Sequence, residues 1–335
     1  MSVMVAGGRA ALVGILIRNA AAIETLAQVD VLVIDKTGTV TEGKPSVVSV
    51  HAANGNSQHE VIRYAASIER SSSHPIARAI VSAATARGLE LMQTSDFLST
   101  PGSGVAANVD GRKISVRRAT GSEIPVSDRE GTSWIAVVSD DTVLGTICLA
   151  DSPKPEARDT LMSLKKDGVR IVMLSGDDLS AVLKVAEEVG IAEAVGSLMP
   201  QEKLERIRSL KAEGFVVAMA GDGVNDAPAL AEADVSIAMG TGTDVAIEAS
   251  DITVLRGDLG GILRARKLSR ETMVNIRQNL FFAFAYNLIG IPVAAGALYP
   301  ILGLTLSPML AAAAMTFSSV SVIANALRLR RVSLD

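Results

Sequence analysis

An aspartate stands at the end of an apolar segment and is followed at once by a glycine turn and hydroxyl side chains. Asp35 opens the sequence DKTGTVT (residues 35–41) and comes directly after residues 29–34, which are apolar except for Asp30. A carboxylate at the carboxyl end of a buried strand faces the crevice of an open parallel sheet, so this pattern predicts a nucleophile that accepts a phosphoryl group. An ordinary strand-to-loop turn with Gly38 at positive φ would explain the same residues without any chemistry.

The residue two positions after this aspartate decides how long a phosphorylated carboxylate would last. Many hydrolases with a nucleophilic aspartate carry a second aspartate there, which serves as general acid and then activates water. This chain has Thr37 at that position. We therefore expect an aspartyl phosphate that forms but hydrolyses slowly, unless another element supplies the base.

Two further apolar segments, residues 169–174 and 214–220, also end in polar motifs. They are followed by SGDD (residues 175–178) and GDGVND (residues 221–226). Because the carboxyl ends of neighbouring parallel strands converge on one crevice, we expect these motifs and the first one to surround a single phosphate.

Individual side chains of these motifs have predictable roles. We expect Ser175 to donate a hydrogen bond to a phosphate oxygen, and Asp35 and Asp222 to form a paired-carboxylate site for Mg²⁺, which prefers oxygen ligands. Lys203, near the start of a predicted helix over 201–211, would offset the charge of the transferring group. A lone lysine on a helix is more often simply solvated.

The motifs DKTGT, SGD and GDGVND, in this order, resemble the signature set of the P-type ATPases, and the resemblance extends over essentially the whole chain. It implies a haloacid-dehalogenase-like phosphorylation domain, which is a doubly wound α/β fold with a parallel sheet. It also implies autophosphorylation of Asp35 by ATP with Mg²⁺. The residues that the resemblance assigns to catalysis are Asp35, Lys36, Thr37, Ser175, Asp177, Lys203, Asn225 and Asp226, and those assigned to Mg²⁺ are Asp35, Thr37 and Asp222.

An insertion over residues 46–143 is long enough for a domain of its own. Within it, residues 67–80 (SIERSSSHPIARAI) predict a helix, a polar break and a second helix from Pro75. The His-Pro pair resembles the mark of the heavy-metal P-type ATPases. That resemblance implies an α+β nucleotide-binding domain in which His74 orients ATP and Glu69 helps to hold the adenine.

The same insertion has a glycine loop and a departure from the family pattern. The loop PGSGV (residues 101–105) fits a glycine pair, Gly102 and Gly104, at which the backbone approaches the nucleotide, although most glycine pairs are plain turns. Arg117 and Arg118 stand where relatives usually carry Gly-Asn. Either adenine binding is weakened, or the arginines turn outward and grip phosphate instead.

Composition limits the remaining possibilities. The chain is 48% hydrophobic over 335 residues, which is too apolar for a purely soluble protein of this length. A net charge of -4 and 3% aromatic residues provide no basic, aromatic-rich surface, so we expect no nucleic-acid partner. The single cysteine, Cys148, excludes an internal disulfide and is expected in a buried strand.

Two segments near the end of the chain, residues 280–298 and 304–327, carry no charge and are each about long enough to cross a bilayer. Arginine and lysine residues flank the pair on both outer sides, whereas the short connection has none. The positive-inside rule then predicts a transmembrane hairpin with both ends in the cytoplasm. A buried helical pair of a soluble protein is the alternative.

Polar residues inside these segments are candidates for function, although each is also typical of helix packing. Tyr286, Asn287, Met315 and Ser319 resemble residues of the last two membrane helices of Cu(I)-transporting P-type ATPases. The thioether of Met315 suits Cu⁺, and Ag⁺ is equally soft. Exporters of zinc or cadmium are expected to carry a charged lysine or aspartate in these helices, and residues 280–298 and 304–327 contain neither.

These inferences divide the chain into a link (residues 1–24), a phosphorylation domain (25–45 and 144–258), a nucleotide-binding domain (46–143) and a membrane domain (259–335). Relatives carry six further membrane helices, a Cys-Pro-Cys site and an actuator domain before the first motif. We therefore expect the C-terminal part of an ATP-driven Cu⁺ or Ag⁺ export pump in the cytoplasmic membrane, its soluble domains cytoplasmic, unable to transport alone.

The resemblance also implies partners: the lipid bilayer, ATP, Cu(I) delivered by a copper chaperone, and the N-terminal half as a separate chain. Two other functions stay open. The chain could be a non-catalytic membrane-bound partner of an intact pump. It could also be a phosphatase on the same fold, which would call for a carboxylate at position 37.

Overall fold

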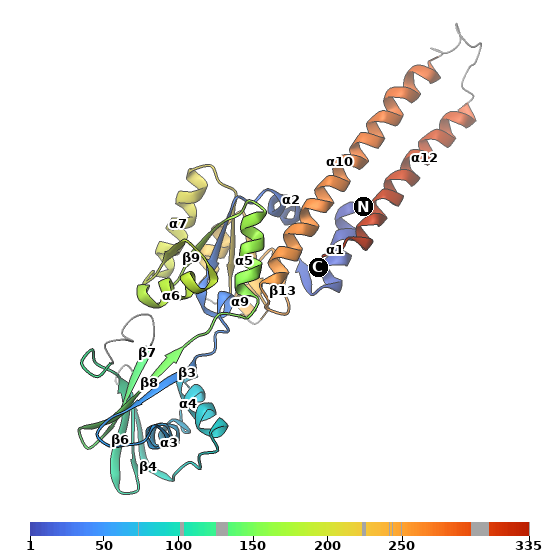
Figure 1. The fold of residues 1–335 in the computed structure, drawn as a ribbon. Helices are drawn as coiled ribbons and strands as arrows, with labels where there is room; N and C mark the ends of the chain where they lie inside the picture. Colours follow the sequence, from blue (N-terminus) through green and yellow to red (C-terminus); the bar gives the residue numbers. More distant parts are fainter. Residues whose placement is uncertain are drawn as a thin grey trace. The chain divides into compact units, whose positions relative to one another are not determined.

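The computed structural model describes most of the chain, which divides into two compact units. The residues described are 1–72, 74–100, 104–124, 133–222, 226–240, 242, 244–248, 250–295 and 308–334. One unit comprises Met1–Val33, Ser163–Arg170 and Leu204–Asp335, and the other comprises Ile34–Met162 and Ile171–Lys203. Figure 1 shows the ribbon.

A seven-stranded sheet carries the three predicted motifs at its strand ends. The strands, in their order across the sheet, are β1 (Ile15–Ile17), β13 (Ile252–Val254), β12 (Val235–Met239), β11 (Val217–Gly221), β2 (Val31–Asp35), β9 (Arg170–Leu174) and β10 (Glu193–Val195). β9 and β10, β11 and β12, and β12 and β13 pair in parallel, while β1 runs antiparallel to β13. Every residue of β2, β11 and β12 is buried, as expected for central strands of a parallel sheet. The predicted α/β class is confirmed.

Helices connect these strands. They are α2 (Ala20–Gln28), α5 (Ala157–Lys166), α6 (Leu179–Val189), α7 (Pro200–Ala212), α8 (Ala227–Glu232) and α9 (Asp244–Glu248). α6 begins where Asp178 accepts a hydrogen bond from the Ser180 backbone N–H, and it ends at Gly190, whose φ of 76° suits a left-handed C-cap. α7 confirms the predicted helix with one residue more at each end.

A second, six-stranded antiparallel sheet is formed by the insertion. The strands, again in spatial order, are β3 (Ser46–Ala52), β8 (Thr142–Ala150), β7 (Ser133–Ser139), β6 (Arg112–Arg118), β5 (Gly104–Val109) and β4 (Thr94–Thr100). β8 pairs with both β3 and β7 along its length, so this sheet continues to Ala150, beyond the boundary expected after residue 143. The cause is hydrophobic: six consecutive residues of β8 are buried. Cys148 is among them, as predicted.

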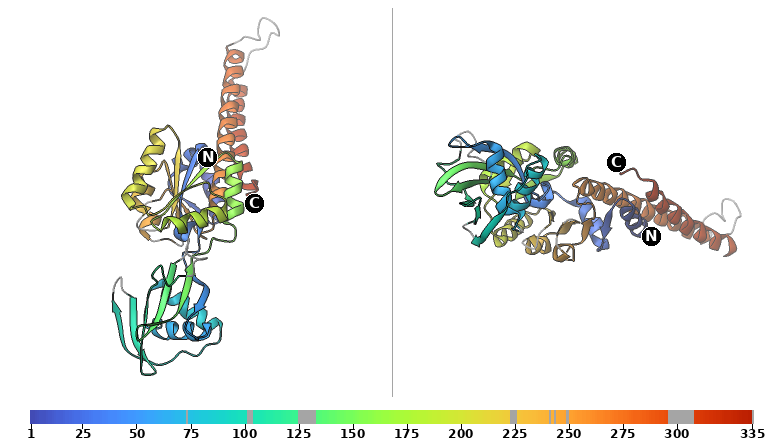
Figure 2. Two further views of the ribbon diagram at one scale, coloured as in Figure 1. Left: turned by 60° about the vertical axis from the view of Figure 1, so that its left-hand side comes forward. Right: turned by 90° about the horizontal axis from the view of Figure 1, so that it is seen from below.

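Two helices pack on one face of this sheet, α3 (Gln58–Glu69) and α4 (Pro75–Ala86) (Figure 2). Their starts follow from local chemistry. Ser57 and Glu60 form a capping box at α3, and at α4 the His74 side chain accepts from the Ile76 N–H just before Pro75. The predicted helix, break and helix are therefore confirmed.

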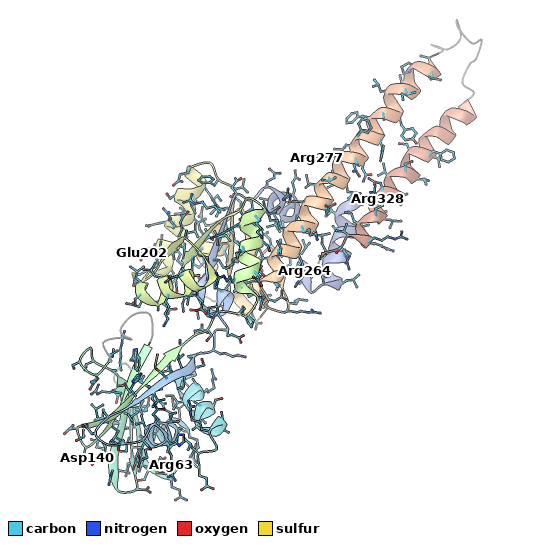
Figure 3. All side chains as sticks on the ribbon, in the orientation of Figure 1. Arg63, Asp140, Glu202, Arg264, Arg277 and Arg328 are labelled. Carbon is cyan, nitrogen blue, oxygen red and sulfur yellow. The ribbon has the colours of Figure 1, made fainter. Side chains whose placement is uncertain are left out.

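The last helices are α10 (Gly260–Ala294) and α12 (Pro308–Leu327), followed by the short 3-10 helix η4 (Arg328–Arg331). Figures 1 and 2 show α10 and α12 side by side, and α1 (Ser2–Leu12) packs against both. Arg264 pairs with Asp258 at the start of α10, Arg277 lies farther along α10, and Arg328 begins η4 (Figure 3).

A buried polar network joins these three helices. Ser2 Oγ donates to Asn275 Oδ1 at 2.9 Å and accepts from Asn279 Nδ2 at 3.0 Å. Asn275 Nδ2 donates to the Asn325 carbonyl at 2.8 Å, and Asn325 Nδ2 donates to Asn279 Oδ1 at 3.0 Å. An unpaired amide would be costly in such a network, so the network fixes the register of α1, α10 and α12.

The structure does not support the two transmembrane spans predicted at residues 280–298 and 304–327. Among the described residues, no helix combines the length with the apolar character that a bilayer crossing requires. Residues 280–294 of the first predicted span lie in the second half of α10. Parts of both spans, residues 296–298 and 304–307, lie outside the described residues.

Candidate active site

Asp35 ends β2, and both of its carboxylate oxygens are held by donors. Lys203 Nζ donates to Oδ1 at 2.5 Å, and the Thr37 backbone N–H donates to Oδ2 at 3.0 Å. The side chains of both Asp35 and Lys203 are at most 7% exposed. A buried carboxylate needs such a partner to remain charged, because desolvation otherwise favours its neutral form. The structure thus places Lys203, which is expected to offset the charge of the transferring group, in contact with Asp35.

Asp177, at the carboxyl end of β9, gathers three side chains from the first and second motifs. Its Oδ2 lies 2.8 Å from Lys36 Nζ and 2.9 Å from Thr37 Oγ1, and Ser175 Oγ lies 3.4 Å away. Burial alone would raise the pKa of Asp177, but the Lys36 ammonium and the two hydroxyls outweigh it and lower that pKa below the ordinary value. Asp177 is thus a charged anchor for the loop that follows Asp35.

That loop, η1 (Lys36–Val40), is clamped by residues that the sequence analysis missed. Gly38 has a φ of 71°, which favours glycine, and the Lys154 ammonium donates to the Gly38 and Thr39 carbonyls at 2.9 and 2.8 Å. Thr41 Oγ1 donates to Asp151 Oδ2 at 2.5 Å. The signal was available, since Asp151 and Lys154 lie in a polar segment directly after the apolar strand β8.

The third motif supplies two further carboxylates, Asp222 and Asp226. Asp222 follows β11 directly, and Asp226 is buried just before α8. An oxygen-only donor set of this kind fits Mg²⁺, which is bound by carboxylates together with phosphate oxygens and water. Asn225, the other predicted residue of this motif, lies outside the described residues.

A cleft of about 1200 Å³ lies in the unit that contains the inserted sheet. It brings together most residues predicted from the first motif, the second motif and the insertion, namely Lys36, Thr37, Glu69, His74, Gly104 and Asp177. Burial raises the pKa of Glu69, although a hydrogen bond from Ser72 opposes it. His74 lies exposed at the cleft, where its Nδ1 caps α4. Gly102 lies outside the described residues.

The first arginine of the pair on β6 is engaged within the protein. Arg117 forms a forked ion pair with Glu123, with Nη2–Oε1 and Nη1–Oε2 distances of 2.6 and 2.9 Å. The hydrogen bonds from Arg117 lower the pKa of Glu123 to about 2. Nearby, a Cβ on Gly104 would lie 2.1 Å from the Val116 carbonyl oxygen, so only glycine fits there.

The residues predicted to carry metal lie on the last two helices. Tyr286 and Asn287 are exposed on α10, and Asn287 Nδ2 donates to the Ala283 carbonyl of its own helix. Ser319 is exposed on α12. Met315 belongs to α12, but its side chain lies outside what the structure describes.

Comparison with known proteins agrees with this geometry. Residues 29–234 match the family of haloacid dehalogenase-like hydrolases. The chain is 47% identical over 350 residues to the silver exporting P-type ATPase of Salmonella typhimurium, with 100% of the chain and 42% of that protein covered. It is 47% identical over 346 residues to the copper-exporting P-type ATPase of Legionella pneumophila, again over 100% of the chain and over 47% of that protein. The chain thus spans less than half the length of these relatives.

Solved structures are also similar. A zinc-transporting PIB-type ATPase in the E2.Pi state matches with a TM-score of 0.87 and 35% identity, over 98% of this chain and 54% of that one. The catalytic domain of the CPx-ATPase CopB-B matches with a TM-score of 0.67 and 35% identity, over 79% of this chain and 98% of that one. The chain therefore belongs to the haloacid dehalogenase-like hydrolases and, within them, to the heavy-metal P-type ATPases.

Proposed function

We propose that Asp35 accepts the γ-phosphoryl group of ATP with Mg²⁺, and that this step drives a pump that exports Cu⁺ or Ag⁺. The observation that carries the proposal is the buried Asp35 carboxylate, held by Lys203 at 2.5 Å and by the Thr37 N–H at 3.0 Å. This arrangement holds the carboxylate with an ammonium and a backbone N–H before the nucleotide arrives.

The transfer is a single displacement. A carboxylate oxygen of Asp35 forms a bond to the γ-phosphorus, the bond from that phosphorus to the bridging oxygen breaks, and ADP leaves with the electron pair. Lys203 offsets negative charge on the transferring group. Mg²⁺ would be held by Asp35, Asp222 and Asp226, with Thr37 close by and Asn225 assisting, and would supply further positive charge at the phosphate.

The other residues of the first two motifs hold the acceptor. Lys36, Thr37 and Ser175 all contact Asp177, and Lys154 holds the carbonyls of the loop. These contacts fix the loop that follows Asp35, which supports a preorganised geometry for attack. These contacts with Asp177 support a positioning role for Lys36, Thr37 and Ser175.

The cleft supports binding of the nucleotide by the inserted domain. Its volume of about 1200 Å³ is large enough for ATP, and Glu69 and His74 line it. We assign the adenine to Glu69, whose raised pKa reflects its burial, and the orientation of ATP to His74. Gly104, and Gly102 before it, would allow the backbone to approach the nucleotide.

Export of a soft cation rests on the relatives and on the last two helices. The relatives from Salmonella typhimurium and Legionella pneumophila are named as silver and copper exporters. Tyr286, Asn287, Met315 and Ser319 would contribute to the cation path, with Met315 as the soft ligand. Large apolar side chains such as Phe281, Phe284, Leu288 and Phe317 are more than two-thirds exposed, which supports a lipid environment for α10 and α12.

The membrane would be the cytoplasmic membrane, with the remaining domains in the cytoplasm. Cu(I) would be delivered by a copper chaperone. Transport would also require the segments of the relatives that this chain does not match.

The phosphatase alternative finds less support. Thr37, at the position where a phosphatase would carry its acid, uses its hydroxyl on Asp177 and has no carboxylate to activate water. Turnover of small phosphate esters by the purified chain would favour it.

Incubation of the full chain in detergent with γ-³²P-labelled ATP and Mg²⁺ tests the proposal. We expect acid-stable, hydroxylamine-labile label on the wild type and none on Asp35→Asn. Label that survives Asp35→Asn, or no label although Mg-ATP binds, would refute phosphorylation at this residue. Binding without label would instead favour a non-catalytic partner of a pump.

A further inference from the structure

The cleft carries charge that the proposed chemistry does not use. Besides the residues already discussed, Arg118 from the end of β6 and Asp178 and Lys184 from the region of α6 line it. Arg118 and Lys184 are exposed, so both can reach a solute that enters the cleft. A cleft that binds a polyphosphate needs cations of this kind, because each phosphate adds negative charge.

The two neighbouring arginines have different surroundings. Arg117 is occupied by its fork with Glu123 and donates a further hydrogen bond to the Arg118 carbonyl. Both arginines line the cleft, but the Arg117 guanidinium is engaged by Glu123, whereas Arg118 is exposed. The two arginines therefore have different roles. Arg117 stabilises the end of β6, and Arg118 presents its guanidinium at the cleft.

We propose that Arg118 binds the phosphate chain of the nucleotide in this cleft, and that Asp178, which lines the same cleft, competes with the nucleotide for its guanidinium. The inference rests on the proposed function and names a phosphate-binding residue for that same site. Arg118 is a binding residue, not one that takes part in the displacement.

The competing role of Asp178 has electrostatic support. Hydrogen bonds from Ser180 lower the pKa of Asp178, and attraction by Arg118 lowers it further. Asp178 is thus ionised near neutral pH and attracts the same guanidinium that a phosphate would. A di- or triphosphate carries more charge than one carboxylate and offers oxygens that match the planar fork of arginine. It therefore binds the Arg118 guanidinium more strongly than Asp178 does.

Calorimetric titration of the full chain with ADP and, separately, with adenosine tests the inference without any phosphoryl transfer. Arg118→Ala is expected to weaken ADP binding roughly tenfold and to leave adenosine binding unchanged, since adenosine has no phosphate. Arg112→Ala is the matched control, because Arg112 is exposed on the same strand and is not part of the cleft lining. It should change neither affinity.

A second variant tests the competition by Asp178. Asp178→Asn keeps an amide oxygen that can cap α6 but removes the charge, so ADP should bind a few times more tightly. Equal weakening of ADP and adenosine in Arg118→Ala, or no weakening at all, would overturn the inference while the proposed function stands. A wild type that binds neither ligand would count against the proposed function itself.

Discussion

Lys203→Met removes the buried ammonium from Asp35 and keeps a side chain of similar length. At the observed Nζ–Oδ1 distance of 2.5 Å, the two charges attract by about 7 kcal/mol at an effective dielectric constant of 20. Much of this attraction offsets the desolvation of both groups. Breaking such a pair on one side nevertheless costs about 3–5 kcal/mol, because the remaining buried charge loses its opposite charge.

The variant has two ways to respond, and both suppress phosphorylation. If Asp35 stays ionised, the folded state loses stability. If Asp35 takes up a proton, it stops being a nucleophile at neutral pH. We expect the initial rate of label transfer from ATP to fall at least 100-fold, equivalent to about 2.7 kcal/mol of barrier.

The assay is rapid-quench labelling of the full chain at several pH values, together with calorimetric binding of Mg-ADP. Lys211→Met on the same helix is the control: Lys211 is about one-third exposed and pairs with Asp234, so its loss should change the rate less than threefold. Wild-type labelling by Lys203→Met, with the label still on Asp35, would refute the reasoning. A parallel loss of nucleotide affinity would point to misfolding instead.

Three further variants test other parts of the site. Lys154→Met should slow labelling about tenfold with unchanged Mg-ADP affinity by calorimetry, because the carbonyls of Gly38 and Thr39 lose their donor; equal effects on both would contradict a positioning role. Asp222→Asn should raise the Mg²⁺ concentration for half-maximal labelling and leave Mg²⁺-free nucleotide binding unchanged. Glu123→Gln should lose about 1 kcal/mol of unfolding free energy at pH 7, after allowance for solvent screening. Because folding lowers the pKa of Glu123 from 4.5 to about 2, denaturation should show this difference above pH 4.5 and its disappearance toward pH 2, whereas a constant difference would exclude the ion pair.

The part of the site that could be predicted is the part built at strand ends. Asp35, Ser175 and Asp177 each follow an apolar run, and the topology of a parallel sheet brings such positions to one edge. Lys203 was predicted only with the help of its place between motifs. Its hydrogen bond to Asp35 depends on where α7 packs, which no local pattern specifies.

Contacts between loops were beyond the sequence reasoning. The fork between Arg117 and Glu123 requires the chain after β6 to turn back, and neither residue has a pattern that indicates a partner six positions away. The continuation of the six-stranded sheet to Ala150 was missed for a similar reason. A buried apolar strand fits either sheet, and only the pairing of β8 with β3 and β7 decides.

The ionisation of Asp177 has a consequence for the fate of the phosphorylated protein. Its pKa lies below the ordinary value, because Lys36 and the hydroxyls of Thr37 and Ser175 outweigh burial. The Asp177 carboxylate is occupied by these three donors, so its position beside Lys36 and the loop serves structure. Thr37 has no carboxylate to activate water. Label chased with unlabelled ATP should decay slowly from the wild type, and Thr37→Asp should accelerate the decay; a wild type that loses its label within seconds would show that another group activates water.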